Sequence, residues 1–400
     1  MMKSRSLRHS LSCVLGGLLL VTVSGCNEEL TVWSGTSQSK FERTVTRQIA
    51  LGGSDTLDVA TRHGSITVTG TDAADCSLEA KIVAHAPTEE EAQALAEQVE
   101  IVDQISGSTA TIRSREPDLE NNRSISVSYT IAVPRRTNIR CDSKYGSLDI
   151  SSVEGRVVGT SNNGSIKIQN IQGQTDLSTS YGSIECRNVV GQSIRLHSNN
   201  GSITMANLRG STAAETSYGA ITCEDFADGD LKLQSDNGRI GVSDARFGIC
   251  EAKSSYGAIA ASRLAGDSID LHSGNGSVEV DGAEAKTLNA SSSYGRIAAT
   301  GIIAATLKTE SGNGSVHVSC APAAPADLNA QLKSSYGSVE LAAPQGFAGE
   351  VYLRTSYGAI HTALPITASG EFTKKEIVGR IGNGAGKIRL ESGSGSVELK

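Results

Sequence analysis

The sequence predicts an all-β fold, a single β-solenoid (β-helix), because one short phrase built around a glycine returns along most of the chain. Successive glycines of this series are mostly 18 or 19 residues apart, and they are Gly64, far upstream, then Gly146, Gly164, Gly182, Gly201, Gly219, Gly238, Gly257, Gly276, Gly295, Gly314, Gly337, Gly358 and Gly395. A repeat this short cannot build a core alone. Stacked copies can, because they bury one another's faces.

Apolar residues within each copy follow the two-residue period of a strand. An aliphatic residue stands two positions after every coil glycine, as Ile203 does, and Ser or Thr always stands three positions before it. Most copies have a third apolar residue seven positions after the glycine: Val153, Ile171, Val189, Leu208, Phe226, Leu264 and Ile302. We therefore expect about three short sides per coil, with these residues turned inward.

The corners and the winding of the coil are predicted from the same repeat. A second glycine often follows nine residues after the first, at Gly155, Gly173, Gly191, Gly210 and Gly266. We expect both glycines to supply positive-φ corners. Right-handed winding is the default, since about 98% of parallel connections are right-handed. The residue before the coil glycine alternates between Tyr and Asn, which leaves a coil of 37 residues as the alternative.

Composition and charge narrow the functional classes. The chain has 400 residues, 43 glycines and only 4% aromatic residues, which suits narrow stacked coils better than a globular core. Its net charge is −7, with acidic and basic residues interspersed. No basic face is available for a polyanion, so nucleic acid is not expected as a partner.

The first 25 residues have the features of a signal peptide. Lys3, Arg5 and Arg8 precede an apolar stretch over residues 11–23. That stretch is shorter than the about 20 apolar residues of a membrane-spanning helix. It ends in Val-Ser-Gly-Cys at residues 23–26, which resembles the lipobox of bacterial lipoproteins.

The lipobox resemblance implies cleavage before Cys26 and attachment of diacylglycerol to its thiol. Asn27 follows the cysteine, which in similar lipoproteins implies sorting to the outer membrane. The chain is then expected to be lipid-anchored to a membrane of the bacterial cell envelope, with residues 26–43 as a tether. An ordinary signal peptide with a chance cysteine is the alternative.

Three further segments complete the expected order. Residues 44–69 hold the first strands and the first coil, because Leu57, Val59, Gly64 and Ile66 fit the coil template. Residues 70–136 interrupt the series and are predicted to form a small αβ insert that caps the first end of the solenoid. Residues 137–400 form the solenoid repeats.

Two places in these segments depart from the repeat. In the insert, Thr88 and Glu91 form a capping box, which predicts a helix start with each side chain bonding the other's backbone N–H. Near the end, the gap of 37 residues between Gly358 and Gly395 predicts two coils. The copy between them, at Phe372, Gly379 and Ile381, is degenerate.

A family resemblance rests on these motifs together. The lipobox, the run from Asp55 to Ile66, the insert, the Ser-Tyr-Gly-Ser-Ile and Ser-Asn-Asn-Gly-Ser-Ile repeats and the Gly-Arg-Ile-Gly-Asn-Gly run at residues 379–384 resemble the bacterial putative-adhesin β-strand-repeat family. The resemblance runs from about Phe41 to Lys400. It implies this architecture and a role in surface adhesion, and it supplies no catalytic residues.

Cysteine and histidine positions argue against a metal or a cofactor, and neither is expected. Cys186 and Cys223 both stand four residues after a coil glycine, where other copies have apolar residues, so they are predicted to be buried free thiols. Two coils would separate them by about 9.6 Å, beyond the roughly 7 Å limit between the Cα atoms of a disulfide. His197 and His272 are predicted to face outward, too far apart to share an ion.

The functional expectation is an envelope lipoprotein that acts as an adhesin or surface scaffold, with a glycan or surface protein as possible partner class. The alternative is a carbohydrate-active β-helix enzyme, a polysaccharide hydrolase or lyase. Outward positions such as Asp149, Lys167 and Thr204 do not gather carboxylates, so we expect no enzyme.

The candidate ligand-binding residues are seven tyrosines that stand directly before a coil glycine: Tyr145, Tyr181, Tyr218, Tyr256, Tyr294, Tyr336 and Tyr357. The fold should place most of them along one edge, about two coils or roughly 9.6 Å apart. Two interpretations are open. Each ring packs over the glycine and Asn corner beside it, or the rings form a row of platforms for an extended glycan.

Overall fold

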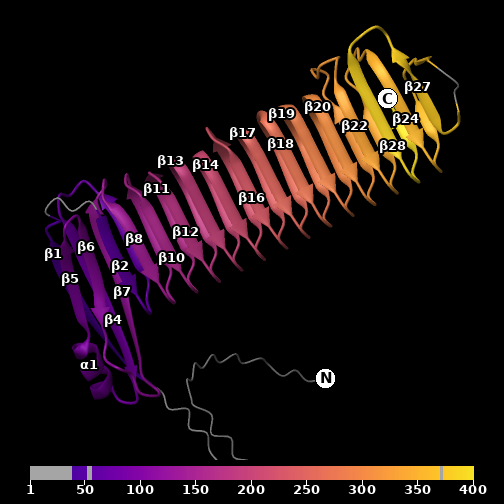
Figure 1. The fold of residues 1–400 in the computed structure, drawn as a ribbon. Helices are drawn as coiled ribbons and strands as arrows, with labels where there is room; N and C mark the ends of the chain where they lie inside the picture. Colours follow the sequence, from indigo (N-terminus) through magenta and orange to yellow (C-terminus); the bar gives the residue numbers. More distant parts are fainter. Residues whose placement is uncertain (1–37, 52–55, 370–372) are drawn as a thin grey trace, which may run out of the picture. The chain divides into compact units, whose positions relative to one another are not determined.

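The computed structural model describes residues 38–51, 56–369 and 373–400, and residues from Gln38 onward form one unit. The signal peptide and Cys26 lie outside the described residues. Within them, the strands join into one continuous, hydrogen-bonded system with a single short helix near its first end (Figure 1).

The N-terminal elements are β1 (Ser39–Ile49), β2 (Thr56–Thr61), β3 (Ile66–Thr71), β4 (Cys76–Ala86), α1 (Glu89–Gln98), β5 (Glu100–Ser106), β6 (Thr109–Arg115) and β7 (Ser124–Pro134). The regular coils are built from β8 (Asn138–Ser143), β9 (Leu148–Val153), β10 (Val157–Ser161), β11 (Ile166–Gln172), β12 (Thr175–Thr179), β13 (Ile184–Ser198), β14 (Ile203–Thr216), β15 (Ile221–Ala227), β16 (Leu231–Ser235), β17 (Ile240–Ser254), β18 (Ile259–Ser273), β19 (Val278–Ser292), β20 (Ile297–Ser311), β21 (Val316–Cys320), β22 (Asn329–Ser334) and β23 (Val339–Ala342). The C-terminal elements are β24 (Gly349–Thr355), β25 (Ile360–Thr362), β26 (Thr367–Ala368), β27 (Glu376–Ile381), β28 (Gly386–Ser392) and β29 (Val397–Leu399).

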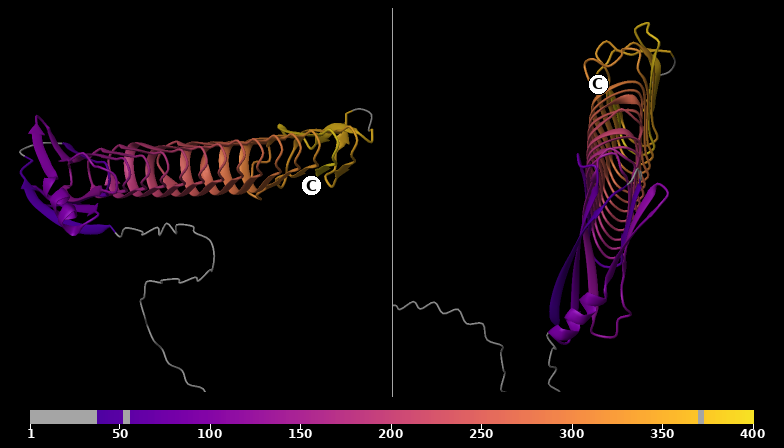
Figure 2. Two further views of the ribbon diagram at one scale, coloured as in Figure 1. Left: turned by 90° about the horizontal axis from the view of Figure 1, so that it is seen from below. Right: turned by 90° about the vertical axis from the view of Figure 1, so that its left-hand side faces the viewer.

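The strand register gives the length of the coil. Ile184 pairs with Ile203, and Ile203 pairs with Ile221, so equivalent residues of neighbouring coils are 19 and then 18 positions apart. These pairings are parallel, and the coils follow one another along one direction (Figure 2). The predicted β-solenoid with coils of 18 or 19 residues is confirmed, and the 37-residue coil is wrong.

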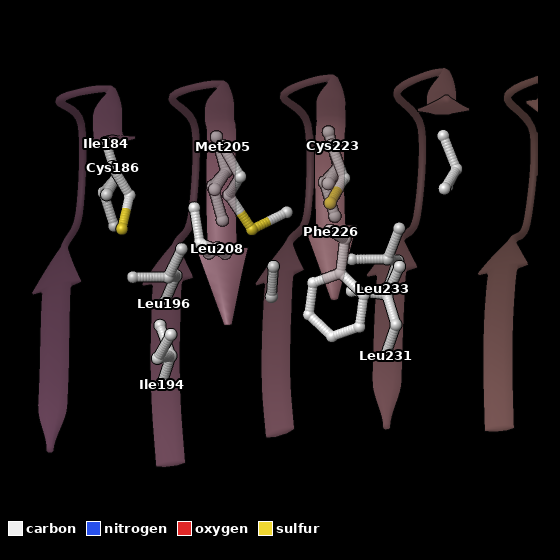
Figure 3. Close-up of a cluster of buried hydrophobic side chains, with 14 of the residues drawn as sticks. Ile184, Cys186, Ile194, Leu196, Met205, Leu208, Cys223, Phe226, Leu231 and Leu233 are labelled. Carbon is white, nitrogen blue, oxygen red and sulfur yellow. The ribbon is translucent and has the colours of Figure 1, made fainter. Parts of the chain in front are cut away.

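The apolar positions predicted to face inward form the core. Ile203 and Ile240 have no exposed surface, and all seven residues at the third contact, Phe226 among them, are buried. In Figure 3, Met205 lies between Cys186 and Cys223, one coil from each. Identical positions of successive coils therefore stack on one another, which is how a narrow coil obtains a continuous core.

The first coil joins the stack across a long stretch of sequence. β2 pairs with β8, with Leu57 opposite Ile139, and β3 pairs with β9, with Ile66 opposite Leu148. On the other side of this coil, β6 and β7 from residues 70–136 continue the pairing in parallel. β4 then pairs antiparallel with both β7 and β1. The open edges of the first coil are thus paired, which removes a template for aggregation.

Two details at this end differ from the expectation. The first strand begins at Ser39, before residue 44, because β1 pairs with β4 along its whole length. Thr88 does cap α1, its hydroxyl accepting a hydrogen bond from the Glu91 N–H at 3.2 Å. The Glu91 carboxylate, however, accepts a bond from Arg123 at 3.1 Å, so the reciprocal half of the capping box is absent from the described bonds.

The positive-φ corner lies at a different position from the one predicted. It falls six residues after the coil glycine, on Ser152, Asn170, Asn188, Asn207, Asp225, Asp244 and Arg263, and in two further coils on Gly282 and Gly301. Asn and Asp tolerate this left-handed conformation better than other non-glycine residues. Among the coil glycines only Gly64, and among the second glycines only Gly210, has a positive φ. The expectation for the other corner glycines is therefore wrong.

Close backbone approach explains the coil glycines instead. A Cβ atom on Gly201 would lie 1.9 Å from the carbonyl oxygen of Gly182 in the preceding coil, and one on Gly238 would lie 1.8 Å from that of Gly219. Any side chain at these positions would push neighbouring coils apart. Glycine is required here because it has no Cβ, and its conformational freedom is secondary.

The Ser or Thr three residues before each coil glycine links neighbouring coils. The Ser235 hydroxyl donates to the Gly219 carbonyl at 3.0 Å and accepts from the Gly238 N–H at 2.9 Å. Ser198 makes the same two bonds with Gly182 and Gly201. The buried hydroxyl thus has a hydrogen-bond acceptor and a donor. An apolar residue in its place would leave one buried backbone carbonyl and one buried N–H without that partner.

We expect Ser235→Ala to lower the free energy of unfolding by about 1–3 kcal/mol, because the Gly238 N–H and the Gly219 carbonyl lose their buried partner. Ser235→Thr is the matched control, since Thr179 and Thr216 make equivalent bonds in other coils. Urea denaturation of both variants measures the difference. Equal stability of Ser235→Ala and wild type would contradict the role of this hydroxyl.

The spatial order of the last coils differs from their order in the sequence. β28 pairs in parallel with β22 on one side and with β24 on the other, and β29 likewise lies between β23 and β25. The last coil of the chain is therefore inserted between two earlier ones (Figure 1). β27 runs antiparallel beside β24, so the predicted degenerate coil around Gly379 and Ile381 is wrong, and Phe372 lies outside the described residues.

Candidate functional site

The seven predicted tyrosines, here called the Tyr row, lie on the surface of the solenoid. Tyr181, Tyr218, Tyr256, Tyr294 and Tyr336 are 63 to 68% exposed, and Tyr357 is 82% exposed. Only Tyr145, at 47%, is substantially covered. Packing against the coil corner thus covers a minor part of most of these side chains, and the rest of each side chain is available to a ligand.

The spacing of the row follows from the pairing of the coils. An Asn-bearing coil separates each of the regular tyrosines from the next, as Asn237 does between Tyr218 and Tyr256. Tyr336 and Tyr357 belong to coils that are consecutive in the sequence. The inserted last coil, with Ser394 at the corresponding position, lies between them. The interval of two coils is therefore maintained through all seven tyrosines.

The row ends at the first coil. There, the position before the coil glycine is His63, whose ring stacks on Tyr145 with 4.7 Å between the centroids. The Lys144 ammonium lies 5.6 Å from the centre of the same Tyr145 ring. Both contacts reduce the exposure of Tyr145, so this ring is the one in which packing predominates.

The corners between the tyrosines are held by hydrogen bonds. The amide nitrogen of Asn237 donates to the Ser217 carbonyl at 3.1 Å, and that of Asn275 donates to the Ser255 carbonyl at 3.1 Å. These carbonyls belong to the residues directly before Tyr218 and Tyr256. Asn200 makes the same bond to the Ser180 carbonyl, so three of these Asn side chains brace backbone that carries a tyrosine.

A polar face borders the row. It consists of the outward side chains six and four residues before the coil glycines, and we call it the groove face. Beside Tyr256 this face has a hollow of about 350 Å³, lined by Gln234, Lys253, His272 and Asn275 among others. A second hollow of about 220 Å³ shares Gln234 and extends to Arg195 and His197. Donors and acceptors for hydroxyl groups therefore lie next to the aromatic rings.

The two histidines face outward, as predicted. His197 and His272 are exposed, with ring nitrogens 3.1 Å from the Asn199 Oδ1 and 2.9 Å from the Ser291 Oγ. The sequence did not predict that these histidines, together with Gln234 and Lys253, line the hollows. The available signal was their recurrence at the same offset before successive coil glycines.

The predicted free thiols are confirmed. Cys186 and Cys223 are buried and unpaired. Burial raises the pKa of Cys223 to about 12 and raises that of Cys186 as well, so neither is a thiolate near neutral pH. Among the residues that the structure describes, no three His, Cys, Asp or Glu side chains gather as a metal site would require.

The described part of the chain holds no helix of the length and apolar character that crossing a membrane demands.

The chain was compared with solved structures, curated proteins and protein families. The chain is similar to a solved putative cell adhesion protein from Clostridium sporogenes at 11% identity and a TM-score of 0.19, covering 90% of this chain and 99% of the other. It is similar to a solved putative adhesin from Bacteroides fragilis at 12% identity and a TM-score of 0.20, covering 90% and 97%. A search of curated proteins finds no match. Residues 220–400 match the model of the Toastrack DUF4097 family.

Proposed function

We propose that this chain is a lipid-anchored envelope protein whose Tyr row and groove face bind an extended polysaccharide, so that it acts as an adhesin or surface-binding module. The observation that carries the proposal is the constant interval of exposed tyrosines. Seven rings recur at every second coil, including the place where the order of the coils departs from the sequence.

A regular row suits a polymer with a regular repeat. Two coils correspond to about 9.6 Å, which is comparable to a disaccharide in an extended polysaccharide. An aromatic ring offers an apolar face to a pyranose ring, and its hydroxyl offers a polar tip. The amides and charged groups of the groove face would bind the sugar hydroxyls. Many weak contacts along one chain then give avidity without a deep pocket.

The anchor is supported by the sequence of residues 1–26. A signal-like segment followed by a lipobox-like Cys26 would attach the mature chain to a membrane through acyl chains. The tether would then hold the solenoid near the envelope surface, where polysaccharides are the abundant extended polymers. Binding and anchoring are separate parts of the proposal and are tested separately.

Changing Tyr218, Tyr256 and Tyr294 together to Ala is expected to abolish retention on polysaccharide affinity gels and barely change the melting temperature. The rings are about two-thirds exposed, so their loss removes little core packing. Val190→Ala with Ile249→Ala is the matched control, since both are exposed apolar residues away from the row. A panel of cell-wall and capsular glycans provides the gels.

Two results would contradict this proposal. If the triple Ala variant is retained as well as wild type, the Tyr row is structural and the ligand face lies elsewhere. If wild-type protein releases shortened or unsaturated products from any glycan of the panel, the chain is a polysaccharide hydrolase or lyase. Retention without product, lost only in the triple variant, is the expected outcome.

A further inference from the structure

A cavity of about 500 Å³ borders the groove face at the C-terminal end of the solenoid and extends beyond it to residues eight positions before the coil glycines. Four strands, β22, β28, β24 and β27, lie side by side there, and their register forms two rows of side chains. One row contains Asn329, Lys387, Glu350 and Arg380. The other contains Gln331, Arg389 and Tyr352. Segments that are far apart in the sequence therefore build one polar site.

Most charges in this cavity are already paired. Arg380 lies 3.4 Å from the Glu350 carboxylate and donates to the Gly384 carbonyl at 2.8 Å. Arg389 donates to Glu391 at 2.8 Å. Lys387 has no carboxylate partner among the ion pairs of the described residues. The cavity thus has one cation in excess of its ion pairs.

The cavity is also held in shape. The Arg389 guanidinium lies over the Tyr352 ring, 4.7 Å from its centre, and also donates to Glu391, two residues further along the same strand. On β27, the Arg380 side chain is held by the Glu350 carboxylate and the Gly384 carbonyl. Preorganised charges of this kind bind a ligand without first losing much side-chain freedom.

We propose that this cavity binds a sugar unit bearing one carboxylate, of the uronic acid type. The Lys387 ammonium would pair with the carboxylate, and the amides of Asn329 and Gln331 would bind sugar hydroxyls. A single excess cation fits a singly charged group better than a doubly charged phosphate. The site lies at the end of the groove face and does not depend on the Tyr row.

The test uses a short oligogalacturonate and its carboxyl-reduced counterpart, which has the same length and no charge. Titration calorimetry with wild-type protein should detect the charged ligand only. Lys387→Gln should weaken its binding about tenfold, because one charge-assisted hydrogen bond is lost. The matched control is Lys167→Gln, an exposed lysine on a different side of the coil, which should bind as wild type does.

Three other results would overturn the proposal that this cavity binds a sugar carboxylate. Equal binding of the reduced ligand, or unchanged binding by Lys387→Gln, would overturn the proposal. Competition by inorganic phosphate at equal concentration would show a general anion site and would also overturn it. The Tyr218, Tyr256 and Tyr294 triple Ala variant should still bind the short oligogalacturonate. Failure of this cavity and failure of the Tyr row are therefore distinguishable.

Discussion

Ile240→Asp is expected to disrupt the solenoid around its own coil. Ile240 is fully buried and pairs with Ile221 and Ile259, which are also fully buried. The change removes an apolar side chain, which alone costs about 2–5 kcal/mol. It also places a carboxyl group between the buried aliphatic side chains of the neighbouring coils, at a further cost of several kcal/mol. Neighbouring coils cannot move apart to admit water without losing their own stacking.

Limited proteolysis and thermal denaturation measure this effect. The variant should be cut in and around residues 221–259, where wild type resists, because a repeat stack loses stability locally first. Thr222→Asp is the control, since Thr222 is exposed and pairs with Gly241 on the same strand pair. If Ile240→Asp melts at the wild-type temperature, the inward assignment of this position is wrong.

Cys26→Ser is expected to move the protein from the membrane fraction to the soluble fraction. Each buried CH₂ group of an acyl chain contributes about 0.8 kcal/mol to membrane attachment, and without the thiol no acyl chain is attached. Fractionation of cells without detergent, followed by immunoblotting, measures the distribution. The size of the mature chain should change as well, because lipoprotein processing at this site depends on the cysteine.

Cys13→Ser is the matched control for the anchor. Cys13 lies within the predicted signal peptide, so its loss should leave the mature protein membrane-bound. A Cys26→Ser variant that still sediments with membranes would show that another interaction holds the protein there. The binding proposal for the Tyr row would remain open in that case, since it concerns the solenoid alone.

The sequence was sufficient to predict the coil, because the inward positions are apolar in most copies. Ile203 and its equivalents are always aliphatic, and stacking requires only that like positions meet. The Ser or Thr before each coil glycine was visible too, but its purpose was not. Only the backbone geometry shows that the Ser235 hydroxyl joins two coils through the Gly219 carbonyl and the Gly238 N–H.

The reason for the coil glycines could not be predicted from residues near them in the sequence. Positive φ is the usual reason for a repeated glycine, and it predicted the corners wrongly here. Gly201 is required by the Gly182 carbonyl of the preceding coil, a contact between residues 19 positions apart. The left-handed corner falls on Asn188 and Asn207, whose side chains also bond each other at 2.9 Å along the stack.

The order of the last coils was decided by tertiary structure alone. Because the coils present similar inward residues, the repeat pattern does not predict which coils the one containing Gly395 stacks on. In the structure a Cβ on Gly395 would meet Gly337, and one on Gly358 would meet Gly395. That insertion spaces Tyr336 from Tyr357 and brings Lys387 between Asn329 and Glu350. The sequence by itself determined what one coil is, whereas the pairing of strand edges determined which coils are neighbours and hence where the candidate sites lie.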